Sequence, residues 1–215
     1  MTSKKTFPSQ TIDVRALPAS ELDDRSPLWW GNTLNLVMET VVFGGLIAMY
    51  VTIVMNTDPF PPVRTTSGLP IIRNAVPDLF LPTIGLIVLL VSLIPAIWLD
   101  ISARRKNVRS IKIASNLTLL FNIAAIIIRY YEFDSLNFKW DDNAYGSILW
   151  IILIMHLIHL VVLLGEDLSV EIWIFFKGVD EKQTIDLTVA AVYWYWIVGV
   201  WVILYLIIYI SPRLM

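Results

Sequence analysis

Long apolar runs alternate with short polar stretches along most of the chain. A helix rises about 1.5 Å per residue, so about 20 apolar residues are needed to cross the hydrocarbon core of a bilayer. The runs are continuous and lack the alternation typical of barrel strands. The pattern therefore predicts an all-α integral membrane protein, a bundle of five transmembrane helices. The expected spans are residues 34–55, 79–99, 111–130, 145–164 and 187–210.

Polar segments flank and connect these runs. Lys4 and Lys5 are followed by a charged, proline-containing stretch, whereas a signal peptide places its apolar run directly after the basic residues. We therefore expect residues 1–28 to form a polar, flexible tail and residues 29–215 to form the transmembrane domain. The connection 165–186 mixes apolar and charged residues. It lies along the membrane interface, packs on a partner, or extends the neighbouring helices.

The composition is that of a chain partly surrounded by lipid, and it excludes several kinds of partner and metal site. The chain has 215 residues, of which 57% are hydrophobic, and its mean hydropathy is +0.69. A net charge of −2 gives no electrostatic case for nucleic acid as a partner. The sequence contains no cysteine, which excludes disulfides, thiolate metal sites and iron–sulfur clusters.

The distribution of Lys and Arg predicts the orientation in the membrane. Of the 16 Lys and Arg residues, eleven lie in the tail and in the second and fourth connections, and five lie on the opposite side. The densest basic group extends from Arg104 to Lys112. Because cytoplasmic loops carry the excess of basic residues, we expect the N-terminus inside and the C-terminus outside.

Three ionisable residues lie inside the apolar runs, where a charge costs at least about 2.5–3.5 kcal/mol. Glu39 lies in the first run, and His156 and His159 lie in the fourth, on one helical face. Glu39 is either a proton-handling or lipid-headgroup site, or a buried carboxyl that fixes helix packing. Because a polar group buried without a hydrogen-bond partner is unfavourable, the polar groups of a small bundle should pair with one another. We therefore predict a hydrogen bond between Glu39 and one of the histidines. Arg129 and Glu132, at the end of the third run, have the spacing to pair near the outer surface.

A cofactor held by this chain is not expected. A bis-histidine haem needs imidazoles on both faces of the porphyrin, but the two histidines share one helix and no third exists. A di-metal carboxylate site needs several inward-facing Glu residues, and only Glu39 has the required depth. Structural histidines bonded to Glu39 or to a backbone carbonyl fit better. Nucleotide-binding and hydrolase motifs are absent from the sequence.

Two helix-packing features are also predicted. Gly44 and Gly45 favour a close helix contact in the first span. Pro82 and Pro95 are expected to interrupt the second span. Interrupted helices are typical of transporters, so a small membrane transporter remains a remote alternative, although no internal repeat is visible.

From Trp29 onward the chain resembles subunit III of the haem–copper cytochrome c oxidases. Six fragments occur in the family's order and at compatible spacing. These are Met38–Tyr50, Pro59–Pro62 with Gly68–Pro70, Tyr130–Glu132, Asp142 with Tyr145–Ser147, His156–His159, and Ala190–Tyr205. The chain departs from the pattern where Arg129 replaces the first Glu of E-Y-Y-E and Ile158 replaces the Gly between the histidines. In the last helix, Tyr195 and Val198 replace a His and an Asp.

The resemblance implies a divergent five-helix member of the family, in the inner (cytoplasmic) membrane of a prokaryote. Such a chain is a non-catalytic accessory subunit of an aerobic terminal oxidase. It packs on catalytic subunit I in a complex with subunit II and binds phospholipid. Haem and copper lie in those partners, and the accessory subunit supports proton uptake and oxygen access.

By the same resemblance, the residues associated with protons, lipid or structure are Glu39, Glu132, His156, His159, Trp194 and Trp201. A related alternative is an accessory subunit of a quinol oxidase or a nitric oxide reductase, because those enzymes also use five-helix members.

Overall fold

The computed structural model describes residues 27–57, 76–178 and 181–214, and all of its regular elements are helices. Five of the described helices are long and apolar enough to cross a membrane, as the hydropathy pattern predicts. Residues 1–26 of the predicted tail and the Pro59–Pro70 loop fragments lie outside the described residues, whereas Pro27 and Leu28, also assigned to the tail, begin the first helix. In chain order the elements are α1 (Pro27–Met55), α2 (Phe80–Arg104), α3 (Val108–Asp134), α4 (Ala144–Lys177), α5 (Glu181–Tyr205), the π-helical turn η2 (Leu206–Ile210) and the 3₁₀ turn η3 (Ser211–Arg213).

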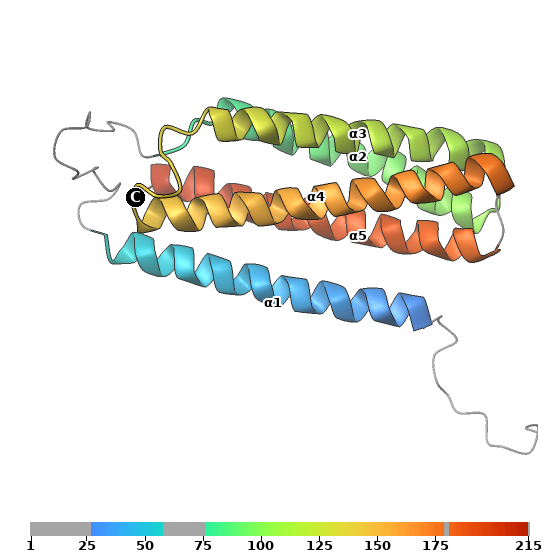
Figure 1. The fold of residues 1–215 in the computed structure, drawn as a ribbon, viewed down its shortest axis with the longest axis horizontal. Coiled ribbons are helices and arrows are strands. Elements are labelled where there is room, and N and C mark those ends of the chain that lie inside the picture. Colours follow the sequence, from blue (N-terminus) through green and yellow to red (C-terminus); the bar gives the residue numbers. More distant parts are fainter. Residues whose placement is uncertain (1–26, 58–75, 179–180, 215) are drawn as a thin grey trace, which may run out of the picture.

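The five helices run side by side, with α1 at the periphery (Figure 1). Helix α2 packs on α3 and α5, α3 packs on α4, and α4 packs on α5, while α1 packs on α4 and α5. Phe43, Tyr50 and Val54 bury one flank of α1 in this contact. Its opposite flank is open, and Val41 is 70% exposed. The structure therefore has a four-helix core to which α1 is attached along one face.

Short polar connections set where the helices begin and end. Asn107 and Asn143 adopt extended backbone conformations, and their side-chain oxygens accept hydrogen bonds from the amides of Ser110 and Gly146. Each asparagine thereby caps a helix N-terminus, satisfying an amide that has no partner within the helix. Gly178 ends α4 with a positive φ of 85°, a conformation that glycine adopts without steric cost.

The connection 165–186 extends its neighbouring helices, because α4 continues to Lys177 and α5 begins at Glu181. At 34 residues, α4 is about 51 Å long and exceeds the hydrocarbon thickness of about 30 Å. Glu171, in the extension, accepts hydrogen bonds from Ser115 and Asn116 of α3. These bonds to α3 hold the extension on the chain's own bundle.

The prediction that prolines interrupt the second span is wrong, because α2 is a single helix. Pro82 lies in its first turn, where the missing N–H has no intrahelical role. Pro95 lies inside the helix and is buried, and packing on α3 and α5 keeps α2 continuous despite the lost backbone bond. An interrupted helix, the transporter feature inferred for this span, is therefore not present in α2.

The predicted close contact at Gly44 and Gly45 is also wrong for the described part of the chain. Both glycines lie on the exposed side of α1, and a Cβ added to either would have no atom within 4 Å. The reason is the position of α1, which has only α4 and α5 beside it and presents the side carrying these glycines to the surroundings.

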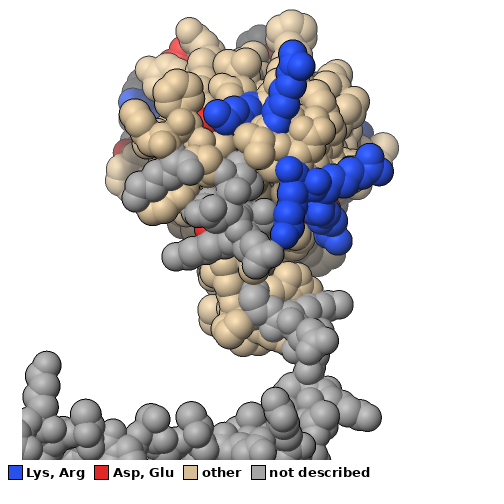
Figure 2. Space-filling model, turned by 90° about the vertical axis from the view of Figure 1, so that its right-hand side faces the viewer, with Lys and Arg blue, Asp and Glu red and all other residues tan. Residues whose placement is uncertain are grey.

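Basic residues gather at one end of the bundle, over the α2–α3 connection (Figure 2). The start of α1, the end of α4 and the start of α5 lie at the same end (Figure 1). The described basic residues of this group are Arg104, Arg105, Lys106, Arg109 and Lys112. The charge asymmetry seen in the sequence is therefore an asymmetry between the two ends of the folded bundle.

Gly146 tests the packing of the α3–α4 connection. A Cβ at this position would lie 2.7 Å from the Lys139 carbonyl oxygen, whereas one at Gly165 would have no neighbour within 4 Å. We expect Gly146→Ala to destabilise the protein by about 1–3 kcal/mol, because backbone must move. The matched Gly165→Ala should be neutral or stabilising by up to about 1 kcal/mol. The midpoint of thermal unfolding in detergent measures both, and equal midpoints would contradict the packing described.

Candidate functional site

Glu39 of α1 and His159 of α4 meet at the interface between α1 and the four-helix core. The Glu39 Oε2 atom lies 3.1 Å from His159 Nε2. The predicted contact between Glu39 and one of the histidines is confirmed. The His159 side chain is 7% exposed, whereas that of Glu39 is 26% exposed, so the carboxyl retains an open side.

The hydrogen bonds of His159 define how its proton is shared. Its Nδ1 atom lies 2.6 Å from the Met155 carbonyl oxygen, which can only accept, so Nδ1 must donate. A proton shared between Nε2 and Glu39 would lie either on His159, giving an imidazolium–carboxylate pair, or on Glu39, whose hydroxyl would donate to a neutral imidazole. The Glu39–His159 pair is thus a contact at which a carboxyl and an imidazole nitrogen can share a proton.

Aromatic rings enclose the Glu39–His159 pair. The ring centroids of Phe43, Trp196 and Tyr193 lie 5.4, 5.6 and 6.3 Å from that of His159. Trp196 Nε1 also donates to Thr40 Oγ1 of α1 at 2.9 Å. The same site therefore supplies both the polar bonds and the ring contacts that join α1 to α4 and α5.

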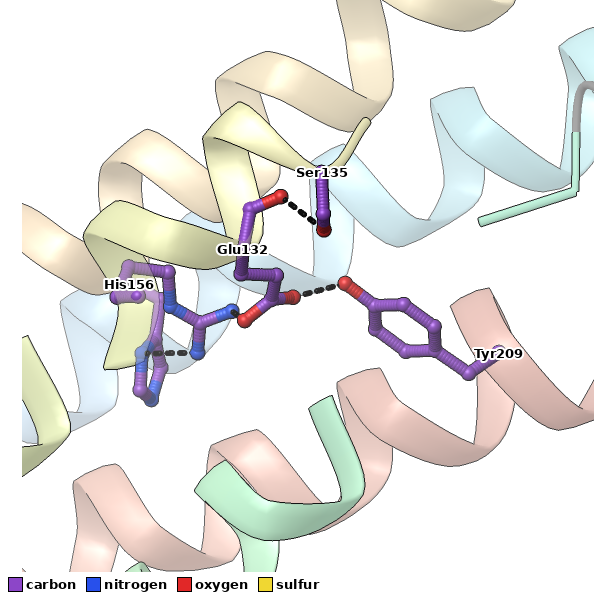
Figure 3. Close-up of polar contacts among 5 residues, drawn as sticks. Glu132, Ser135, His156 and Tyr209 are labelled. Atoms are coloured by element: carbon purple, nitrogen blue, oxygen red, sulfur yellow. Dashed lines mark hydrogen bonds and ion pairs between the residues drawn. The ribbon is translucent and has the colours of Figure 1, made fainter. Parts of the chain in front are cut away.

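A second polar site, the Arg129 cluster, joins α3, α4, α5 and η2 and consists of Arg129, Glu132, His156, Trp201 and Tyr209. Figure 3 shows Glu132, His156 and Tyr209 of this cluster with their polar contacts. Arg129 Nη1 donates to Glu132 Oε2 at 2.7 Å, and Arg129 Nη2 lies 3.4 Å from His156 Nδ1. The Tyr209 hydroxyl donates to the other oxygen of Glu132. All five side chains are buried. The predicted Arg129–Glu132 pair is confirmed, and it is buried within the bundle near the end of α3.

The two tryptophans singled out in the sequence are core residues, and both are buried. The guanidinium carbon of Arg129 lies 3.6 Å from the ring centroid of Trp201, a cation–π contact in a desolvated environment. Trp194 donates to the Ser92 hydroxyl at 2.9 Å, and Ser92 donates to the Leu89 carbonyl. Trp201 thus supports the Arg129 cluster, and Trp194 joins α5 to α2.

A π-helical turn brings Tyr209 to the Arg129 cluster. The α-helical pattern of α5 ends at Tyr205 and is followed by η2, which contains Tyr209. Arg213, just beyond it, donates to the Tyr209 and Pro77 carbonyls. Sequence reasoning missed Tyr209, because an apolar run with tyrosines gives no sign of a change from α to π hydrogen bonding. Such turns occur often at functional sites.

The two histidines share a helical face but have different partners. His159 faces α1, whereas His156 lies between Arg129 and the Ile197 carbonyl oxygen, which is 3.2 Å from its Nε2 atom. Both ring nitrogens of His156 are therefore engaged, which leaves none to ligate a haem iron. Within the described ranges, no three His, Asp or Glu side chains are arranged to hold a metal ion.

Comparison with known proteins agrees with this arrangement. The family model for cytochrome c oxidase subunit III matches residues 22–212, which include all five helices and both polar sites. The chain belongs to the cytochrome c oxidase subunit III family. A curated relative, cytochrome c oxidase subunit 3 of Thermostichus vulcanus, is 23% identical over 185 residues, covering 85% of this chain and 87% of the relative. Members of the subunit III family are accessory subunits, so membership implies a complex with other oxidase subunits.

Removal of the Tyr209 hydroxyl tests the Arg129 cluster. In Tyr209→Phe, one oxygen of the buried Glu132 carboxylate loses its donor. We expect a loss of about 1–3 kcal/mol in the free energy of unfolding, the cost of a buried acceptor without a partner. Tyr130→Phe is the matched control, because Tyr130 lies in the same helix as Glu132 and is 71% exposed. Unfolding by SDS in mixed micelles gives both values, and a Tyr209→Phe midpoint equal to that of the control would refute the bond's contribution.

Proposed function

We propose that this subunit III-family chain is the non-catalytic accessory subunit of a haem–copper terminal oxidase in aerobic respiration. It packs on catalytic subunit I, in a complex with subunit II, and those partners carry the haem and copper. The observation that carries the proposal is the family match over residues 22–212. The Glu39–His159 pair adds support, because it places a carboxyl and an imidazole where the resemblance leads us to expect membrane acid–base residues.

Proton uptake is the chemistry that the Glu39–His159 pair can support. The carboxyl and the imidazole can share a proton, and the open side of Glu39 gives that proton a route out of the bundle. A carboxyl that is partly exposed at membrane depth is costly in lipid alone, so water or a partner subunit should face it. The proposed role is to receive or release a proton next to the catalytic subunit.

Lipid contact and oxygen access are proposed for the open flank of α1. This flank is apolar, and its exposed residues include Leu34, Met38, Val41 and Met55. Apolar surface of this kind binds phospholipid acyl chains, and oxygen partitions into the hydrocarbon that covers it. The flank adjoins Glu39, so acyl chains and the proton site share one side of the subunit.

We also propose that the basic end of the bundle faces the cytoplasm, with the N-terminus inside, the C-terminus outside and the chain in the inner membrane of a prokaryote. The support is the group of basic residues over the α2–α3 connection (Figure 2). The opposite end carries Lys139 and Arg213, and Arg213 bonds to backbone carbonyls.

Single cysteines test this orientation, because the chain has no cysteine of its own. Arg105→Cys places a thiol in the α2–α3 connection, and Asn137→Cys places one in the α3–α4 connection, both at exposed positions. We expect a membrane-impermeant maleimide to label Asn137→Cys in intact spheroplasts and Arg105→Cys only after permeabilisation. The reverse labelling pattern would overturn the orientation.

Purification of the tagged chain from membranes of its own organism tests the oxidase assignment. We expect the chain to elute with partners whose optical spectrum shows haem, and the electron donor to be identified by supplying cytochrome c or quinol. A nitric oxide reductase complex would reduce nitric oxide rather than oxygen. Elution of a stable, haem-free chain that transports a solute would support the transporter alternative and refute the proposal.

The same purified complex can be used to test the proposed role of Glu39 in proton uptake. We expect Glu39→Gln to assemble normally but to lower sustained oxygen consumption by about 5-fold, a rate change equivalent to about 1 kcal/mol, the typical worth of one hydrogen bond. Asp100→Asn is the control, because the ion pair of Asp100 among the described residues is with Arg104 at the basic end. Sustained turnover that matches the control would remove Glu39 from the proposed role.

A further inference from the structure

Arg129 occupies a position where the family resemblance predicts a glutamate. In the structure the arginine is buried and faces three groups: Glu132, His156 and the ring of Trp201. A buried cation needs a counter-charge and hydrogen-bond acceptors. Glu132 supplies the charge, and the indole ring covers one face of the guanidinium. Where the family pattern E-Y-Y-E implies two carboxyls, this chain has an ion pair between Arg129 and Glu132.

The hydrogen-bond roles at His156 follow from its neighbours. A guanidinium can only donate, so His156 Nδ1, 3.4 Å from Arg129 Nη2, must accept and carry no proton. A backbone carbonyl can only accept, so Nε2, 3.2 Å from the Ile197 oxygen, must donate. Only the neutral imidazole with its proton on Nε2 satisfies both neighbours. A second proton on Nδ1 would point at a guanidinium cation.

The surroundings of His156 keep this arrangement. The charged and titratable groups around it are Arg129 and Glu132 from α3, Tyr209 from η2 and His159 one turn along α4. The ionisable residue nearest in depth on α1, Glu39, is paired with His159. Helix α2 carries charged residues only at Asp100 and Arg104, near its far end. Glu132 accepts from Arg129 through one carboxyl oxygen and from Tyr209 through the other, so both of its oxygens face donors.

We propose that Arg129 is a positioning residue that fixes His156 as the neutral Nε2–H tautomer, so that this imidazole exchanges no proton. The inference concerns contacts within the chain and does not depend on the oxidase assignment. It gives two histidines that lie three residues apart in sequence different roles, because His156 bonds inside the Arg129 cluster and His159 contacts Glu39.

Nitrogen NMR of the full chain in lipid nanodiscs tests the proposal directly, because the sequence contains only two histidines. In His159→Gln protein labelled with ¹⁵N-histidine, every imidazole signal comes from His156. We expect one protonated and one unprotonated nitrogen, unchanged between about pH 5 and pH 8, where an ordinary imidazole titrates. A His156 ring that is protonated on Nδ1, or that titrates in this window, would overturn the proposal.

A double variant then tests the role of Arg129. Arg129→Met with Glu132→Gln removes the donor and leaves no unpaired charge in the core. In the His159→Gln background we expect His156 to lose its single tautomer and to become responsive to pH. Arg213→Gln is the control, since Arg213 bonds to the Tyr209 and Pro77 carbonyls and not to His156. An unchanged His156 signal in a folded double variant would show that Arg129 does not set the tautomer. If the double variant does not fold, the pH response of His156 in the parent protein alone decides.

Discussion

The membrane interior supplies no water to a polar side chain, so each ionisable group inside the helices must find its partner in the protein. This constraint explains the two polar sites of the bundle. Glu39 is paired with His159, and Arg129 is paired with Glu132 and bonded to His156. The Glu39–His159 contact joins α1 to α4. The Arg129–Glu132 ion pair lies within α3 and holds Arg129 beside His156 of α4. The costly residues in the spans are therefore also the residues that determine which helices meet.

The two sites differ in how completely their hydrogen bonds determine the protons. At the Arg129 cluster, donors and acceptors alternate without ambiguity, from the guanidinium to His156 and onward to the Ile197 carbonyl. At the Glu39–His159 pair, the Nδ1 atom of His159 donates to the Met155 carbonyl, but the contact between Nε2 and Glu39 does not fix which group carries a proton. The first arrangement suits a rigid joint between α3, α4 and α5. The second suits proton exchange, and its location at the attachment of α1 places it at the least enclosed part of the bundle.

Sequence reasoning succeeded where a rule follows from one residue and its local pattern. Apolar runs of sufficient length predict the five helices, and the cost of buried charge predicts that Glu39 meets a histidine. It failed where the outcome depends on which helices are neighbours. Gly44 and Gly45 have no helix opposite them because α1 is peripheral, and Pro95 is accommodated because α2 is held on two sides. The hydrogen bond from Tyr209 to Glu132 depends on a π-helical turn, and the residue types in this segment do not indicate such a turn.

The unequal enclosure of the helices has a functional consequence. The four-helix core encloses the Arg129 cluster. Helix α1 instead leaves Glu39 partly open beside an apolar flank, with Thr40 and Trp196 bonded to each other at its edge. A half-covered carboxyl at membrane depth is stable when a second protein surface or ordered water completes its environment. The geometry of α1 is thus that of a subunit whose chemistry is completed by a neighbour, as expected for a member of the subunit III family.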